Sequence, residues 1–279
     1  MNACEKSPDE NRSEGYSRPT KIAHVIYRFD FGGLENGLVN IINGSPEWVS
    51  HTIVTLNGSN SVFAERLHKH VDIISVDKKP GKDLAVYFRL WKVLKSIRPD
   101  VVHTRNLSAI EAQIPALLAG IKYRVHSEHG WDIRDPNGDV KKYQLIRRAV
   151  GLLVHRIIPL SRQLESYLTE KVKIPAKKIT RICNGVDLNR FQNSQMNHSH
   201  IEGIDKQRFV LMSIGRLEKI KGHRDLILAL SELYKENPGV SAKLQVVIVG
   251  DGSQRDDLQK QAESLGLGRL VHFLGSRSD

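Results

Sequence analysis

The regular alternation of short apolar runs with longer amphipathic stretches is the feature that most constrains how this chain can fold. Apolar runs of strand length predict strands at Ile22–Tyr27, Thr52–Leu56, Val71–Val76, Asp100–Thr104, Tyr123–Ser127 and Arg156–Pro159. Apolar residues at helical spacing predict helices after Gly33 and over Val62–Lys69, Leu84–Ile97, Ser108–Ala119 and Val140–His155. Strands that alternate with helices favour right-handed crossovers, and therefore a parallel sheet covered on both faces.

The same pattern restarts after a polar stretch. Strands are predicted at Phe209–Ile214, Leu244–Val249 and Leu270–Leu274, and helices at Gly222–Glu236 and Gln254–Leu265. A length of 279 residues also suggests two domains. We therefore predict a disordered leader (1–20), a first doubly wound α/β domain (21–191), a linker (192–207) and a second domain (208–279). The second domain should be incomplete, because three strands leave a buried-type strand close to a sheet edge.

The net charge of +11 lies almost entirely in the first part of the chain. Residues 1–190 contain 30 Lys and Arg against 20 Asp and Glu, whereas residues 191–279 contain 12 against 11. This imbalance indicates an anionic partner, which could be nucleic acid, a membrane surface or a phosphorylated substrate. Nucleic acid is disfavoured, because the cations are not interleaved with aromatic residues that could stack on bases.

No apolar run reaches the ~18 residues that a membrane-spanning helix needs, and the first twenty residues lack the apolar core of a signal peptide. The cysteines, Cys4 and Cys183, have no metal-binding or redox spacing. We therefore expect a cytoplasmic protein. The helix around residues 141–156 leaves two interpretations open, a solvated face or a surface that lies on an anionic bilayer. This basic helix contains Lys141, Lys142, Arg147, Arg148 and Arg156 and no acid. Lys141, Arg148, His155 and Arg156 lie opposite its apolar face, with Leu145 and Leu152 between them.

The turn Ser213–Gly222 joins a predicted buried strand to a helix, so it lies where open α/β sheets bind ligands. Arg216 offers a planar fork and Lys221 a point charge, and a diphosphate suits both, although the two could also be simply solvated. No Walker A motif, complete dinucleotide fingerprint, Asp-x-Asp triplet or zinc-type histidine pair occurs. A diphosphate would therefore be bound without a metal ion, by cations, glycine amides and helix N-termini.

Six short motifs in order extend this pattern over the chain after the leader. They are Gly32-Gly33-Leu34-Glu35, His129-Gly130, Asn184-Gly185-Val186-Asp187, Gly215-Arg216-Leu217 with Lys221-Gly222, Val249-Gly250-Asp251-Gly252 and Phe273-Leu274-Gly275. Together they resemble the retaining, metal-independent glycosyltransferases of family 4, and among these the bacterial sugar transferases of exopolysaccharide assembly. The resemblance implies the GT-B fold, which consists of two Rossmann-like doubly wound parallel-sheet domains.

The resemblance also implies a reaction, in which a sugar passes from a nucleotide-diphosphate donor, bound between the domains, to a glycan or lipid-linked acceptor. Retention would require no protein base, since the departing phosphate accepts the acceptor's proton, and no cofactor or metal is expected. The implied site residues are Gly33, Arg216, Lys221 and Gly250 for the donor diphosphate, His129 as the catalytic residue that contacts the transferred sugar, and Gly32, Glu35, Asn184 and Asp187 for the acceptor side or a turn.

Structural alternatives remain for several of these residues. His129 could be a core histidine at a strand end, Glu35 a first-turn carboxylate favoured by the helix dipole, and Asn184 a turn former. Members of the family also carry a later segment with two glutamates separated by seven residues, which this sequence lacks. We therefore expect a C-terminally truncated product that is peripheral on the inner face of the membrane and has little transferase activity. The alternative is a non-catalytic remnant that binds a sugar nucleotide or a partner.

Overall fold

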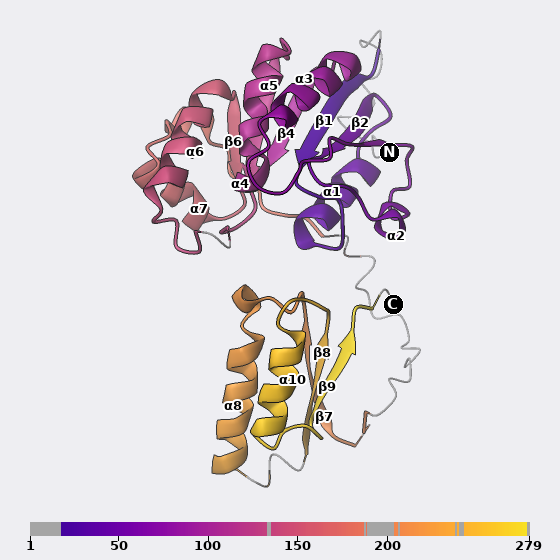
Figure 1. Cartoon of the computed structure of the whole chain (residues 1–279), viewed down its shortest axis with the longest axis vertical. Helices are drawn as coiled ribbons and strands as arrows, with labels where there is room; N and C mark the ends of the chain where they lie inside the picture. The colour runs from indigo at the N-terminus through magenta and orange to yellow at the C-terminus, as the bar shows by residue number, and fades with distance from the viewer. Residues whose placement is uncertain are drawn as a thin grey trace, which may run out of the picture. The chain divides into compact units, whose positions relative to one another are not determined.

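A computed structural model describes residues 18–132, 135–186, 188, 204–205, 207–237, 239 and 243–277. The chain forms two compact units, Met1–Gln192 and Asn193–Asp279 (Figure 1). Asp187, Cys4, residues 1–17 of the predicted leader and most of the predicted linker lie outside the described residues.

The first unit is built on a six-stranded parallel sheet with the order β3-β2-β1-β4-β5-β6. Its strands are β1 (Thr20–Ile26), β2 (Val49–Thr55), β3 (Asp72–Ser75), β4 (Val101–Arg105), β5 (Tyr123–Glu128) and β6 (Arg156–Pro159). Every predicted strand of this domain is present, with ends that differ by a few residues. The strand order reverses between β1 and β4, and such a switch point is the usual ligand position in open α/β sheets.

The helices of the first unit follow the predicted alternation, with local departures. They are α1 (Gly33–Asn43), α2 (Ser61–Ala64), α3 (Ala85–Ile97), α4 (Asn106–Ala109), α5 (Gln113–Leu118), α6 (Lys141–Leu153) and α7 (Arg162–Ser166). The prediction of a helix to Lys69 is wrong, since α2 ends at Ala64. The Asn43 side chain donates to the Arg66 carbonyl and accepts from the His68 N–H, so the backbone after α2 bonds to a side chain instead of continuing the helix.

The predicted helix 108–119 is divided into α4, a 3₁₀ turn at Ile110–Ala112 and α5. Pro115 lies in the first turn of α5, where its missing N–H is tolerated. The helix α7, which continues into a π-helical turn at Tyr167–Lys171, was not predicted. Within the described residues, no helix is long and apolar enough to cross a bilayer.

Alternating strand residues supply cores on both faces of the first sheet. On β1, Ala23 and Val25 pack with residues of α3 and α5, whereas Ile26 packs with Leu38 and Ile42 of α1 on the opposite face. A third cluster joins α6 to β6 and to the segment after α7. Because strand side chains alternate, His24 lies on the same face as Ile26, under the side of the sheet that α1 covers.

The second unit holds a three-stranded parallel sheet with the order β7-β8-β9. Its elements are β7 (Phe209–Ile214), α8 (His223–Glu236), β8 (Leu244–Val249), α10 (Arg255–Ser264) and β9 (Val271–Gly275). The two helices lie on one side of this sheet (Figure 1) and share a core with Leu217, Val246 and Ile248. On β7, Met212 and Ile214 remain exposed. The predicted α/β class with two parallel sheets is confirmed.

Candidate functional site

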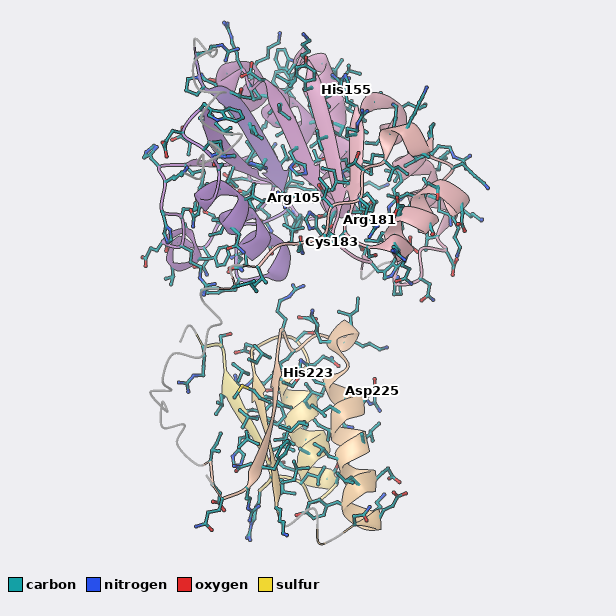
Figure 2. All side chains as sticks on the ribbon, turned by 180° about the vertical axis from the view of Figure 1, so that it is seen from behind. Arg105, His155, Arg181, Cys183, His223 and Asp225 are labelled. Atoms are coloured by element: carbon teal, nitrogen blue, oxygen red, sulfur yellow. The ribbon has the colours of Figure 1, made fainter. Side chains whose placement is uncertain are left out.

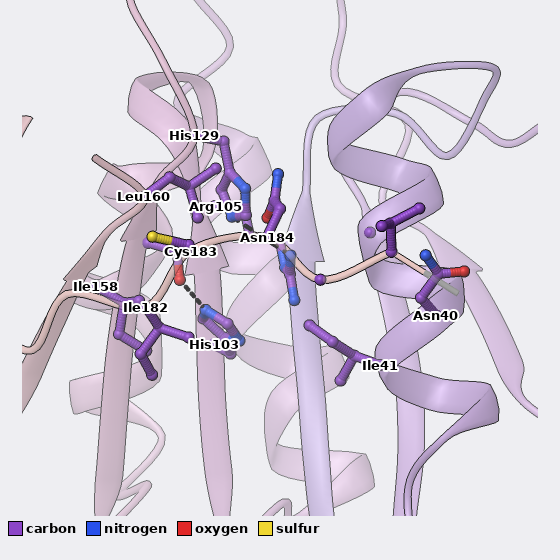
Figure 3. A pocket seen from close by; sticks show the side chains of 14 residues that line it. Asn40, Ile41, His103, Arg105, His129, Ile158, Leu160, Ile182, Cys183 and Asn184 are labelled. Atoms are coloured by element: carbon purple, nitrogen blue, oxygen red, sulfur yellow. Dashed lines mark hydrogen bonds between the residues drawn. The ribbon is translucent and has the colours of Figure 1, made fainter. Parts of the chain in front are cut away.

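A pocket of about 490 Å³ lies on the α1 face of the first sheet, near the carboxyl ends of β4, β5 and β6. The strand register sets Arg105, Ser127 and Ile158 side by side across three strands. The pocket is lined by Gly37, Asn40, Ile41, His103, Arg105, Ser127, His129, Ile158, Leu160, Ile182, Cys183, Asn184, Gly185 and Val186. Asn40 and Ile41 of α1 lie on one side of the pocket and Ile158 of β6 on the other, and the segment 182–186 crosses from the β6 side toward α1 (Figure 3).

Arg105, the last residue of β4, brings a buried positive charge to this pocket (Figure 2). Only 1% of the residue is exposed, and its Nη1 lies 3.4 Å from His129 Nε2. Its Nε and Nη2 have no hydrogen-bond partner among the residues that the structure describes. Burial lowers the pKa of Arg105 to about 10, although the negative charge of Glu35 acts to raise it. Because the pKa remains well above neutrality, the guanidinium stays charged and offers free donors.

His129 follows β5 and is held by its backbone, since its N–H donates to Asn106 Oδ1 at 2.6 Å. Asn106 itself has a left-handed φ of 58°. Burial, together with the charges of Arg105 and His126, lowers the pKa of His129 to about 3, so the ring is neutral at physiological pH. A guanidinium can only donate, so Nε2 of His129 accepts and Nδ1 carries the proton. That Nδ1 is buried and has no hydrogen-bond partner in the described part of the chain. His129 is therefore a neutral donor.

Three further histidines form a row beneath the pocket, on neighbouring strands of the sheet. His24 Nε2 lies 3.0 Å from His51 Nδ1, and the His24 ring lies 5.5 Å from that of His103. His103 in turn shares a hydrogen bond with Ser127. Burial lowers the pKa of all three imidazoles, and the Arg105 charge lowers those of His24 and His103 further. The row is therefore neutral at physiological pH and adds no second charge under the pocket.

The residue before His129 anchors the end of β5 in the interior. Glu128 accepts from Arg147 Nε at 2.7 Å, and both side chains are almost fully buried. Burial alone would raise the pKa of Glu128, but His126 and Arg147 lower it to about 2, so the carboxylate is ionised. Arg147 is one of the cations of the predicted basic helix, and the structure assigns it to the core instead of the surface.

The Gly-Gly-Leu-Glu motif forms the start of α1. A Cβ atom placed on Gly32 would lie 2.1 Å from Glu35 Oε2, whereas Gly33 is exposed and has no atom within 4 Å of such a position. The Glu35 carboxylate thus lies over Gly32, the residue directly before its own helix, as the first-turn interpretation expects. Asn184 lies near the next turn of α1, because a Cβ on Gly37 would be 3.8 Å from its Oδ1.

The predicted diphosphate turn connects β7 to α8 in the second unit. Arg216 and Lys221 are both exposed, and neither forms an ion pair within the described residues. A Cβ on Gly250, whose φ is 137°, would lie 2.0 Å from the Gly215 carbonyl oxygen. The close crossing of two turns therefore requires this glycine, and its contact with a diphosphate stays a prediction.

The structure thus groups the predicted residues into two sets. His129 and Asn184 line the pocket of the first unit, and Glu35 acts on the pKa of Arg105. Arg216, Lys221 and Gly250 belong to the second unit. Sequence reasoning missed Arg105, His103 and Ser127. The strand was predicted to end at Thr104, and a cation directly after a buried strand was the available signal.

Comparison with protein families gives two consecutive matches. The family described as "Glycosyltransferase Family 4" matches residues 31–190, and the family described as "Glycosyl transferases group 1" matches residues 194–279.

Two of the curated relatives are glycosyltransferases of bacteria. The UDP-Gal:alpha-D-GlcNAc-diphosphoundecaprenol alpha-1,3-galactosyltransferase of Escherichia coli is 29% identical over 205 residues, which are 71% of this chain and 52% of that protein. An alpha-1,4-N-acetyl-D-galactosaminyltransferase of Campylobacter jejuni, whose name includes a diphosphate-linked undecaprenol glycan, is 26% identical over 91% of this chain and 67% of its own length. The chain therefore spans about half the length of the first of these relatives.

Solved structures establish the likeness of fold. Anabaena HepE in complex with UDP and glucose has a TM-score of 0.70 and 20% identity, over 93% of this chain and 70% of that one. WaaG, a glycosyltransferase of lipopolysaccharide biosynthesis, has a TM-score of 0.67 and 17% identity, over 92% and 70%. These neighbours confirm the predicted GT-B fold.

The architecture is shared by a UDP-GlcNAc 2-epimerase of Neisseria meningitidis, with 16% identity and a TM-score of 0.62 over 92% of this chain and 73% of that one. The fold alone therefore does not specify the reaction. The family-4 match covers more than half of the sequence, and the chain belongs to glycosyltransferase family 4.

Proposed function

We propose that this chain acts in the transfer of a sugar from a nucleotide-diphosphate sugar to a lipid-linked or glycan acceptor, with retention and without a divalent metal ion. The observation on which the proposal rests is the turn between β7 and α8. Two exposed cations, Arg216 and Lys221, stand there without acidic partners among the described residues, at the carboxyl end of a parallel strand. The names of the curated relatives, one a UDP-galactose enzyme with a diphosphoundecaprenol acceptor, support the substrate class.

At the donor, the cations would neutralise the leaving diphosphate. The fork of Arg216 suits two phosphoryl oxygens and the ammonium of Lys221 a third, while Gly222, the residue before α8, adds no side chain of its own at the start of that helix. Charge that develops on a leaving diphosphate in a water-poor site is typically stabilised by ~3 kcal/mol per well-placed donor. We propose that these groups neutralise the diphosphate in place of a metal ion.

At the sugar, His129 would act as a hydrogen-bond donor. Its pKa of about 3 leaves the ring neutral, and Nδ1 carries the free proton. A donor suits a sugar hydroxyl, whereas a ring with that pKa is a weak base. We therefore propose that the departing phosphate receives the acceptor's proton on the same face, which gives retention. With an α-linked donor the product should be α-linked, and the anomeric coupling in its NMR spectrum tests this.

Nucleotide binding tests the donor site directly. Isothermal titration of the purified chain with UDP, in buffer that contains EDTA, should show binding. The double variant Arg216→Ala/Lys221→Ala should bind about tenfold more weakly or worse, a loss of at least ~1.4 kcal/mol. Lys260→Ala removes an exposed cation from α10 of the same unit and should leave affinity unchanged. An absence of binding to UDP, ADP and GDP alike would refute the donor assignment. Binding only with Mg²⁺ would refute the metal-independent mechanism.

We also propose peripheral association with the inner face of the cell membrane through α6. Its outer side presents Leu145 and Leu152, which are 66% and 74% exposed, beside the exposed cations Lys141, Lys142, Arg148 and Arg156. Exposed leucines among cations suit an anionic bilayer surface. The protein should sediment with liposomes that contain phosphatidylglycerol, and Leu145→Ser/Leu152→Ser should weaken this. Equal sedimentation with neutral liposomes would contradict the proposal.

A further inference from the structure

We propose that the pocket around Arg105 binds the phosphoryl end of an amphiphilic acceptor, with the guanidinium on the phosphoryl oxygens and the apolar wall against the adjoining hydrocarbon. The inference rests on the proposed function, in which the acceptor is lipid-linked. It goes further by naming the side chains that recognise that acceptor.

The first argument is the unused hydrogen-bonding capacity of Arg105. Only 1% of the residue is exposed, yet within the described residues Nε and Nη2 have no hydrogen-bond partner, and the side chain bonds to His129 alone. A buried, poorly satisfied charge costs several kcal/mol, so a fold that retains one without a ligand gains nothing from it. The Nε and Nη2 donors of one planar guanidinium suit a tetrahedral oxyanion.

The second argument is the charge of the surroundings. No acidic residue is among the described residues that line the pocket. His103 and His129 line it as neutral rings, because burial and the Arg105 charge lower the pKa of each. Glu35 acts on Arg105 from the start of α1 but does not line the pocket. An entering anion therefore meets one buried positive charge and no lining carboxylate, which is attractive in a low-dielectric site.

The third argument is the apolar wall, which favours an amphiphile over a nucleotide as the ligand of this pocket. Five aliphatic side chains line the pocket, namely Ile41, Ile158, Leu160, Ile182 and Val186. Of these, Ile41, Ile182 and Val186 are about half exposed, so they present apolar surface that a hydrocarbon chain could cover. A nucleotide would instead place polar base edges and ribose hydroxyls there. The side-chain amides of Asn40 and Asn184 are too few to satisfy all of them.

The test compares a whole amphiphile with its diphosphate alone, with its hydrocarbon alone and with a nucleotide. Farnesyl diphosphate, inorganic pyrophosphate, farnesol and UDP are titrated into the purified 279-residue chain. Farnesyl diphosphate should bind more tightly than pyrophosphate or farnesol. Arg105→Gln should weaken its binding at least about tenfold and leave UDP affinity unchanged, whereas Arg216→Ala/Lys221→Ala should do the reverse. Failure of the donor site and failure of this inference thus give different patterns.

Thermal stability separates a ligand-binding arginine from a structural one. Arg105→Gln should melt at the same temperature as the wild type or higher, because it removes a buried unsatisfied charge. The matched control is Arg124→Gln, in which the lost guanidinium bonds the carbonyls of Leu153 and Ile121. This control should melt at a lower temperature and keep its affinity for farnesyl diphosphate.

Three results would overturn the inference. One is an unchanged affinity of Arg105→Gln for farnesyl diphosphate. Another is a loss of UDP affinity in the same variant, which would show that the pocket binds the donor. The third is equal affinity for pyrophosphate and farnesyl diphosphate, which would leave the apolar wall without a role. Arg105→Lys, which keeps the charge and loses the fork, should bind with intermediate affinity if the oxygens are held by two parallel bonds.

Discussion

Gly250 and Gly252 lie where two turns of the second unit cross. A Cβ on Gly250 would lie 2.0 Å from the carbonyl oxygen of Gly215, and one on Gly252 would lie 2.6 Å from that of Leu217. The crossing is held by hydrogen bonds from the N–H of Gly215 to Val249 and from that of Leu217 to Asp251. Both glycines are therefore required by the contact of backbone with backbone, whether or not a phosphate also approaches.

Replacing Gly250 with alanine should destabilise the second unit strongly. The substitution creates a clash with main-chain atoms and imposes a φ of 137° on an L-residue, so the free energy of unfolding should fall by at least ~2 kcal/mol. Urea denaturation followed by far-UV circular dichroism measures the loss. Gly268→Ala is the matched control in the same unit, since its nearest neighbour would be Glu263 Cγ at 3.6 Å, an ordinary contact. A similar loss in both variants would contradict the explanation.

At the scale of the element, α6 shows what periodicity can and cannot predict. The helix was expected over residues 140–155 and extends over Lys141–Leu153, with Leu145 and Leu152 outside and Val150 inside as predicted. Arg147 was counted among the cations of the helix, but it lies on the buried arc and pairs with Glu128. A charged residue on the apolar face of a helix can be recognised in the sequence. Its partner, on another element, is not identifiable from helical spacing.

Breaking this buried pair should be costly. Arg147→Met leaves the ionised Glu128 without its main partner, so the free energy of unfolding should fall by ~3–5 kcal/mol. Urea denaturation followed by tryptophan fluorescence measures it, because all three tryptophans, Trp48, Trp91 and Trp131, belong to the first unit.

The double variant Glu128→Gln/Arg147→Met should recover part of that loss, since it removes the Glu128 charge and leaves only the buried Asp135, which lies 3.6 Å from Arg147 Nη1, without its ion-pair partner. Lys171→Ala is the control, because it breaks an exposed ion pair with Asp139 and should cost no more than ~1 kcal/mol. If the double variant were as unstable as Arg147→Met alone, packing of the arginine stem would explain the effect better than charge.

At the scale of the molecule, the alternation of strands and helices was enough to predict two parallel sheets and nearly every strand. The pocket could not be predicted, because it depends on which strands are neighbours. The order β2-β1-β4-β5 brings His51, His24, His103 and Ser127 into one row, although their sequence positions are far apart. Apolar periodicity shows that a strand is buried, but it does not show which strand lies beside it.

The row of histidines should make the first unit sensitive to mild acid. His24, His51 and His103 have a lowered pKa in the folded chain, so below about pH 6.5 the unfolded chain binds more protons than the folded one. The free energy of unfolding should therefore be constant above about pH 7 and fall as the pH decreases, by up to ~1.4 kcal/mol per pH unit for each histidine. Tryptophan-monitored urea denaturation between about pH 7.5 and 5 measures the slope.

In this window Glu128, whose pKa is about 2, stays ionised in both states and adds nothing to the pH dependence of the free energy of unfolding. His24→Leu should reduce the slope by about a quarter, because His129 also has a lowered pKa and contributes, whereas His70→Gln, an exposed site, should not change it. A stability that is independent of pH across this range would show that the row is not held neutral by the fold.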